Sequence, residues 1–139
     1  MTDKVQLFSE DIIQVKGGDI LHVMKSTSNS YKGFGEAYFS LIKYRFIKGW
    51  KLHKRMTLNL VVPYGEVKFV IYENECFKEY ILSNKNYSRL TIPPNIWFGF
   101  QGLSKKESIV LNIANIKHEA NEVSRKKIEE FNYDWSELK

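Results

Sequence analysis

The segment EVKFVIYENECFKEYIL, residues 66–82, contains the pattern that recurs along most of the chain. Two runs rich in β-branched and aromatic residues, Glu66–Glu73 and Cys76–Leu82, are separated only by Asn74 and Glu75. Runs of this length and composition are typical of β-strands, and a short connection that begins with Asn is typical of a turn. The segment therefore predicts two strands joined by a turn.

The same pattern extends in both directions from this segment. Further strands are expected at Ile12–Val15, Leu21–Lys25, Gly35–Leu41, Lys51–Val62, Tyr87–Ile92, Trp97–Gln101 and Ser108–Ile113. The connections are rich in Gly, Pro, Asn and Ser, as turns require. So many short runs predict an all-β jelly roll. Only Ala120–Phe131 has a helical spacing of apolar residues, so a short C-terminal α-helix is expected there.

Composition limits the classes of protein that the chain can represent. With 139 residues, 43% of them hydrophobic, we expect a single domain over residues 1–139. We expect a cytoplasmic protein with no membrane partner, because no long apolar stretch occurs and Met1–Glu10 does not resemble a signal peptide. The single cysteine, Cys76, excludes an intrachain disulfide. A net charge of +5 indicates an anionic partner, but the scattered basic residues do not favour nucleic acid.

The segment IKGWKLHKRM, residues 47–56, carries the strongest chemical signal. In an extended strand alternate side chains share a face, which places Gly49, Lys51, His53 and Arg55 together. This cationic face either points to water or lines a ligand cavity inside the barrel. In the second case its side chains form an anion-binding pocket around one histidine.

Two other segments hold candidate binding residues. In LTIPPNIWFGF, residues 90–100, a Pro-Pro pair ends one strand and Trp97 and Phe98 begin the next. Their rings either pack in the barrel floor or stack on a base or sugar. In GFGEAYFS, residues 33–40, Glu36 and Tyr38 share a strand face, where they either lie on the surface or exchange protons with a substrate. No phosphate-binding glycine loop, nucleophile elbow, zinc motif or calcium loop occurs.

Four short motifs, in this order, resemble the dTDP-4-dehydrorhamnose 3,5-epimerase family of cupins. They are GFGE at 33–36, IKGW at 47–50, GEV at 65–67, and IPP at 92–94 followed by GF at 99–100. The resemblance implies a cupin-type double-stranded β-helix and a dTDP-linked 4-keto-6-deoxy sugar as ligand. In that family a histidine removes the proton next to the C4 ketone, a lysine stabilises the enolate and a tyrosine returns a proton.

The resemblance implies a role for each candidate residue. The implied catalytic residues are His53 as the base, Lys51 as the electrophile, and Tyr38, Tyr44 or Tyr72 as the acid. Lys48 stands where the family has a diphosphate-binding arginine. The other implied substrate-binding residues are Arg55, Glu36, Asn59, Trp97 and Phe98.

Several positions differ from the family pattern. Lys51 stands at the place of the family histidine, so His53 lies one strand period further along, and Phe98 replaces a second histidine. The family tyrosine falls near Asn115 or Ile116. Cupin ketoisomerases of dTDP-sugars are of similar length but typically carry a histidine-rich strand that this chain lacks. The sequence therefore favours a sugar-nucleotide epimerase or isomerase of surface-polysaccharide (O-antigen or capsule) synthesis, with a non-catalytic nucleotide-sugar-binding cupin as the alternative.

Expectations about cofactors and partners follow from the same residues. Two cations beside one imidazole repel a divalent metal, so we expect no metal and no cofactor. The resemblance also implies a homodimer in which a strand within residues 11–25 crosses to the partner.

Overall fold

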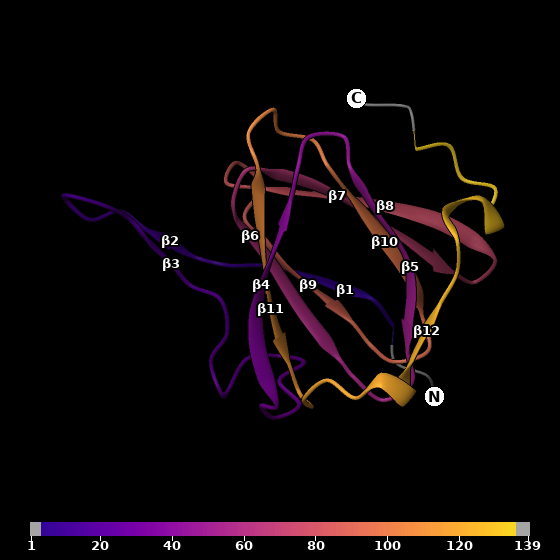
Figure 1. The fold of residues 1–139 in the computed structure, drawn as a ribbon. Coiled ribbons are helices and arrows are strands. Elements are labelled where there is room, and N and C mark those ends of the chain that lie inside the picture. Colours follow the sequence, from indigo (N-terminus) through magenta and orange to yellow (C-terminus); the bar gives the residue numbers. More distant parts are fainter. Residues whose placement is uncertain (1–3, 136–139) are drawn as a thin grey trace.

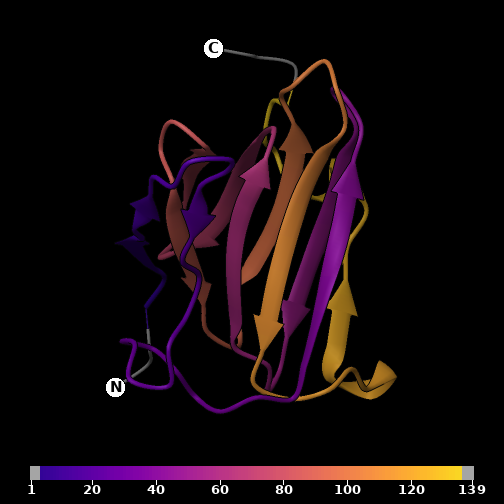
Figure 2. The same ribbon diagram turned by 90° about the vertical axis from the view of Figure 1, so that its left-hand side faces the viewer.

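The computed structural model describes residues 4–135, which form two antiparallel five-stranded sheets stacked face to face (Figures 1 and 2). The first sheet has the order β1 (Gln6–Ser9), β9 (Ser88–Ile92), β6 (Leu58–Tyr64), β11 (Ser108–Ala114) and β4 (Glu36–Ile42). The second has the order β12 (Val123–Arg125), β5 (Ile47–His53), β10 (Trp97–Gly102), β7 (Glu66–Glu73) and β8 (Cys76–Ser83). The expected all-β class is confirmed.

A small hairpin extends away from the two sheets (Figure 1). It consists of β2 (Ile12–Ile13) and β3 (Ile20–Leu21), which pair only with each other. The expected strand Ile12–Val15 is shorter in the structure, and the expected strand Leu21–Lys25 shares only Leu21 with β3.

The main core lies between the sheets and follows from strand alternation. Leu58, Leu60 and Val62 of β6 face Val67, Phe69 and Ile71 of β7, and all six side chains are almost fully buried. Alternate residues on these strands point to opposite faces, so each strand gives one apolar row to the core. Burial of such rows is the main force that holds the sheets together.

A second apolar cluster covers the outer face of the second sheet. Residues 126–135, here called the C-terminal strap, bring Ile128, Phe131 and Trp135 onto Trp50 and neighbouring side chains. Trp50 is fully buried, and its indole N–H donates to the Ile128 carbonyl at 3.2 Å. The strap therefore covers this outer face of the second sheet.

The helix expected at Ala120–Phe131 is wrong. The structure has two single 3₁₀ turns, η1 (Ala120–Glu122) and η2 (Ile128–Glu130), with β12 between them. The physical reason is that β12 pairs with the edge of β5. The backbone groups of this segment therefore find their hydrogen-bond partners on a neighbouring strand and not within a helix. No helix among residues 4–135 could cross a membrane.

Some strand boundaries also differ from the expectation. The single run Lys51–Val62 is divided into β5 and β6, because the chain leaves the ladder after His53 and the backbone N–H groups of Arg55 and Met56 donate to Glu122. β1 and β12 were not expected, since both are short and partly polar.

Candidate active site

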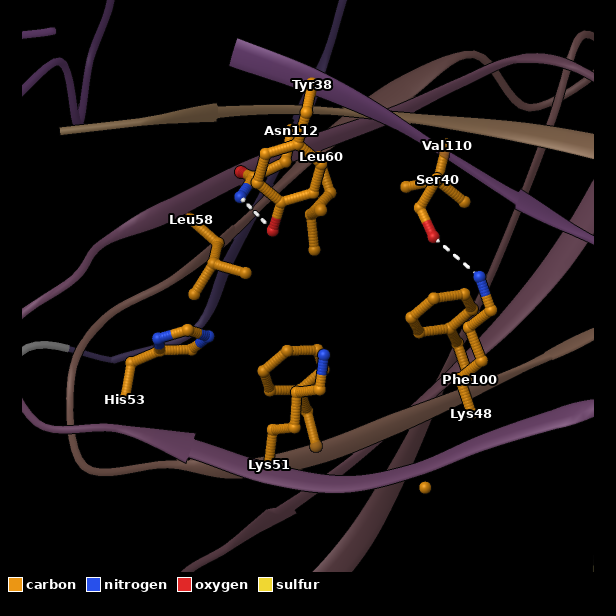
Figure 3. Close-up of a pocket in the computed structure, with 12 residues that line it drawn as sticks. Tyr38, Ser40, Lys48, Lys51, His53, Leu58, Leu60, Phe100, Val110 and Asn112 are labelled. Carbon is orange, nitrogen blue, oxygen red and sulfur yellow. Dashed lines mark hydrogen bonds between the residues drawn. The ribbon is translucent and has the colours of Figure 1, made fainter. Parts of the chain in front are cut away.

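A cavity of about 280 Å³ lies between the two sheets (Figure 3). Strands β4, β5, β6, β10 and β11 contribute its walls. The wall formed by β5 is cationic, and the wall formed by β4 and β11 carries uncharged polar groups. Apolar residues line the walls between these two. The lining residues are Tyr38, Ser40, Lys48, Gly49, Lys51, His53, Leu58, Leu60, Phe98, Phe100, Val110 and Asn112.

A β-bulge in β5 brings Lys48 to the same cavity as Lys51 and His53. Phe98 and Phe100 of β10 lie opposite Lys51 and Lys48, so β5 has one extra residue between the two pairs. Strict alternation would place Lys48 on the opposite face from Lys51. Because a bulge re-aims the side chains that follow it, both ammonium groups line the cavity.

The base candidate, His53, forms a buried pair with Glu122. The His53 side chain is 6% exposed, and its Nδ1 is hydrogen-bonded to a carboxylate oxygen of Glu122, whose side chain is fully buried. The other oxygen accepts the backbone N–H groups of Arg55 at 3.1 Å and Met56 at 3.3 Å. The acceptor carboxylate assigns the Nδ1–H tautomer, so the lone pair lies on Nε2.

Glu122 is held in its charged form. Burial alone would raise the pKa of its carboxyl group, but the hydrogen bond with His53 and the two backbone N–H groups outweigh burial, and the pKa lies below its usual value of 4.5. A charged Glu122 stabilises the imidazolium that forms when His53 accepts a proton. The pair therefore has the arrangement of a general base and its orienting group.

Tyr38 lies across the cavity from His53 and Lys51 (Figure 3). Its hydroxyl oxygen accepts a hydrogen bond from Asn112 Nδ2 at 3.1 Å. Burial raises the pKa of Tyr38 despite the hydrogen bond with Asn112, and the charges of Glu36 and Glu122 raise it further. The phenol is consequently protonated near neutral pH and can donate its proton to a bound ligand.

Two lysines supply positive charge to the cavity. Lys48 Nζ donates to Ser40 Oγ at 2.9 Å and to the Leu41 carbonyl at 2.7 Å, which fixes its position near Phe100. Burial lowers the pKa of Lys51, and repulsion from Arg125 and Lys48 lowers it further. Lys51 therefore releases a proton more readily than an exposed lysine.

The structure brings together part of the predicted site. His53, Lys51, Tyr38, Lys48 and Phe98 line the cavity, as expected for residues that face the inside of the barrel. The ring of Phe98 stacks on that of His53 with a centroid distance of 6.2 Å, so Phe98 forms part of the wall.

The other predicted residues lie outside the cavity. Arg55 follows the end of β5 and pairs on the surface with Glu119 at 2.7 Å, because the chain has already left the strand. Glu36 accepts the backbone N–H of His118 at 3.0 Å. Asn59 is buried in a network with Arg89 and Thr91 on the other face of β6.

The remaining aromatic candidates also lie elsewhere. Trp97 and Tyr72 line a separate groove beside the C-terminal strap, where the Tyr72 ring contacts Phe131 at 4.8 Å between centroids. Tyr44 forms an isolated bridge with Gly102. None of these three is among the residues that line the cavity.

Sequence reasoning missed Glu122, Asn112 and Ser40. Asn112 could have been found, because it lies between the apolar residues Val110 and Ala114 on one face of the strand. Ser40 could also have been found, since it lies one strand period after Tyr38. Glu122 gives no such signal, because its position depends on a 3₁₀ turn and on a strand pairing far away in sequence. Among residues 4–135 no group of three or more His, Cys, Asp or Glu side chains is arranged to hold a metal ion.

Two stacked antiparallel sheets that enclose a cavity lined by His53, Lys48 and Lys51 define a cupin-like fold. The chain belongs to the FdtA family, described as "WxcM-like, C-terminal", whose model matches residues 18–134. No curated protein matches the chain significantly.

Solved structures share this fold. A dTDP sugar isomerase from Desulfovibrio desulfuricans G20 is 29% identical, with a TM-score of 0.90 over 97% of this chain and 92% of that chain. The sugar 3,4-ketoisomerase QdtA from Thermoanaerobacterium thermosaccharolyticum, solved with TDP, is 18% identical, with a TM-score of 0.78 over 91% and 90%. A dTDP-4-dehydrorhamnose 3,5-epimerase from Elizabethkingia anophelis NUHP1 is 14% identical, with a TM-score of 0.77 over 96% and 82%. The resemblance to sugar-nucleotide-modifying cupins is confirmed.

Proposed function

We propose that the protein is a dTDP-sugar isomerase that converts dTDP-4-keto-6-deoxyglucose to its 3-keto isomer. The observation that carries this proposal is the buried His53–Glu122 pair, which holds one imidazole nitrogen and leaves the other to a cavity that also contains Lys51 and Tyr38. Proton transfer next to a ketone needs a positioned base and a group that stabilises the developing oxyanion.

The proposed reaction moves one proton between neighbouring carbon atoms. Nε2 of His53 takes the proton from C3, the electron pair of that bond forms a C3=C4 double bond, and the C4 carbonyl oxygen becomes an oxyanion. Tyr38 or Lys51 protonates this oxygen and afterwards receives the proton of the C3 hydroxyl. His53 returns its proton to C4, which leaves the ketone at C3.

Two observations favour the ketoisomerase over the 3,5-epimerase that the sequence motifs alone suggest. The family to which the chain belongs is FdtA, and the solved structures that share the fold include the ketoisomerase QdtA, crystallised as a variant with TDP-4-keto-6-deoxyglucose. A single base is also sufficient when one residue removes the proton from C3 and protonates C4, so the reaction requires no second histidine at Phe98.

The positive charges of Lys48 and Lys51 favour the binding of an anionic substrate. Lys48 and Lys51 line the cavity, and no carboxylate is among its lining residues. Each ammonium group has three donors, and Lys48 uses two of them within the protein. The third is available to a phosphate oxygen.

We place the reaction in the cytoplasm, as a step in surface-polysaccharide synthesis.

We also propose a homodimer, because two apolar surfaces remain exposed. Ile13 and Ile20 of the projecting hairpin are about half exposed, and Phe39 and Leu41 are exposed on the outer face of β4. An isolated two-stranded hairpin is only marginally stable in water. A second copy of the chain would cover both surfaces at once.

Product analysis tests the proposed activity. The protein is incubated with dTDP-4-keto-6-deoxyglucose in deuterated water and the product is identified by NMR. We expect a C3 ketone with deuterium at C4 of the product, because the proton held on His53 exchanges with solvent before it is delivered, and deuterium at C3 only in recovered substrate. Deuterium at C3 and C5 with the ketone retained at C4 would identify an epimerase, and tight binding with no exchange would identify a non-catalytic binding protein.

A further inference from the structure

We propose that Asn112 is a positioning residue of the active site, whose amide group directs the hydroxyl proton of Tyr38 into the cavity. The inference rests on the proposed function and deepens it, because it names the group that prepares Tyr38 for proton transfer. Asn112 lies within β11, its side chain is 1% exposed, and it lines the cavity together with Tyr38.

The fold gives the amide group of Asn112 a single orientation. Its Oδ1 accepts the backbone N–H of Asn59 in β6 at 3.1 Å, and a backbone N–H can only donate. The amide oxygen must therefore face β6, which leaves the amino group to face β4 on the other side of β11. An amide free to flip would alternate between a donor and an acceptor, whereas this amide always presents a donor to Tyr38.

Strand pairing brings this amino group to Tyr38. The two residues are direct partners in the ladder between β11 and β4, so their side chains share the inner face of the sheet (Figure 3). Asn112 Nδ2 lies 3.1 Å from the Tyr38 hydroxyl oxygen. Because the amino group can only donate, the hydroxyl oxygen is the acceptor in this bond.

The hydroxyl hydrogen of Tyr38 is consequently left for another acceptor. Within residues 4–135 the hydroxyl has no hydrogen-bond partner other than Asn112. In the proposed reaction the C4 oxygen of the substrate takes this proton as it becomes an oxyanion. The O–H bond of Tyr38 breaks and leaves a phenolate, which then receives the proton of the C3 hydroxyl as the C3 ketone forms.

Asn112 also stabilises the phenolate that Tyr38 becomes. Burial is the main cause that raises the pKa of Tyr38, with the charges of Glu36 and Glu122 in support, and the hydrogen bond from Asn112 opposes them. A fixed donor at an oxygen where negative charge develops stabilises the transition state more than the ground state. Asn112 therefore acts on the reaction through Tyr38.

The matched control for a purely structural role is Asn115. Its Oδ1 accepts the backbone N–H of Thr57 at 2.7 Å, so it also ties the β11 segment to the β6 segment. Unlike Asn112, it does not line the cavity. Asn115→Leu thus removes a bond of the same kind between the same two segments and leaves Tyr38 untouched.

Steady-state kinetics with dTDP-4-keto-6-deoxyglucose test the inference. We expect Asn112→Leu to lower kcat about tenfold with KM nearly unchanged, because one hydrogen bond to a reacting group has an effect of this order. In the Tyr38→Phe background the same substitution should lower kcat no further, since the hydroxyl on which it acts is gone. Asn115→Leu should keep the wild-type kcat. Should Asn112→Leu not fold, Asn112→Ala replaces it in the same set of variants.

The outcomes separate this inference from the proposed function. If the wild-type protein isomerises the substrate and Asn112→Leu does so at the same rate, the inference is wrong and the proposed function stands. A loss of the same size with and without the Tyr38 hydroxyl would also overturn it, because Asn112 would then act on the substrate or on the fold. So would an equal loss in Asn115→Leu, or a Tyr38→Phe variant with the full rate. If the wild-type protein does not isomerise the substrate, both proposals fail.

Discussion

The side chain of His53 is suited to the proposed role of base because Glu122 is hydrogen-bonded to Nδ1 and Nε2 remains on the side of the cavity. A histidine with both nitrogens in water would change tautomer freely. Here a carboxylate with no exposed surface fixes the tautomer and is itself fixed by two backbone N–H groups. The orientation and the tautomer of the imidazole are thus set before a ligand arrives.

Replacing the orienting carboxylate should reduce catalysis more than binding. We expect Glu122→Gln to lower kcat on the order of 100-fold, within the range that general acid–base catalysis contributes. TDP affinity, measured by calorimetry, should change little because Glu122 does not line the cavity. An unchanged kcat would show that the pair does not act as proposed.

The same carboxylate predicts a pH dependence of stability. The pKa of Glu122 is lowered in the folded protein, so its stabilising contribution is present above its usual pKa of 4.5 and is lost as the pH falls below that value. Urea unfolding of the wild type and Glu122→Gln should differ most near pH 7. The difference should shrink below pH 4.5, and a difference that grows there would contradict the assignment.

Tyr38 should act in catalysis and not in nucleotide binding. Tyr38→Phe removes the hydroxyl and keeps the ring, so we expect kcat to fall on the order of 100-fold with TDP affinity nearly unchanged. Tyr72→Phe is the matched control, because Tyr72 lies in the groove outside the cavity. Equal losses in both variants would remove Tyr38 from the mechanism.

At the level of strands and turns, the elements that the sequence predicts are those with a regular period. β7 has the predicted bounds Glu66–Glu73, and β8, β9, β10 and β11 differ from prediction by one residue at an end. The bulge in β5, the η1 turn and the pairing of β12 with β5 arise from contacts between distant segments. Period and propensity do not encode such contacts, so His53 was predictable but its partner Glu122 was not.

The C-terminal strap should contribute strongly to stability. Trp135 is 5% exposed, and its ring packs on Trp50 at 5.3 Å between centroids. Trp135→Ala should lower the free energy of unfolding by about 3–5 kcal/mol, as for other large-to-small core substitutions. Phe34→Ala, at an exposed position, should change it by less than about 0.5 kcal/mol. Urea denaturation measures both, and equal values would mean that the strap does not pack on the sheet in solution.

For the molecule as a whole, the two sheets form a frame in which the proposed catalytic cavity is separate from the covered and open outer faces. The inner faces hold the core and the cavity, one outer face carries the strap, and the outer face of β4 remains open. The alternation of side chains along the strands predicted which residues face the inside of the barrel. It did not show which outer face the chain itself would cover.

The open face predicts the oligomeric state. We expect light scattering at micromolar concentration to give the mass of a dimer. Phe39→Glu places a charge on this exposed apolar face and should shift the protein to monomers without unfolding it. A monomeric wild-type protein would contradict the proposed dimer.

The central claim is that His53 moves the proton on the sugar ring. The most direct measurement follows deuterium incorporation into dTDP-4-keto-6-deoxyglucose by NMR, for the wild type and for His53→Asn, with TDP affinity measured for both. We predict incorporation at C4 of the 3-keto product in the wild type, and a rate lower by at least about 100-fold in His53→Asn with TDP binding retained. Incorporation by His53→Asn at the wild-type rate would contradict the account.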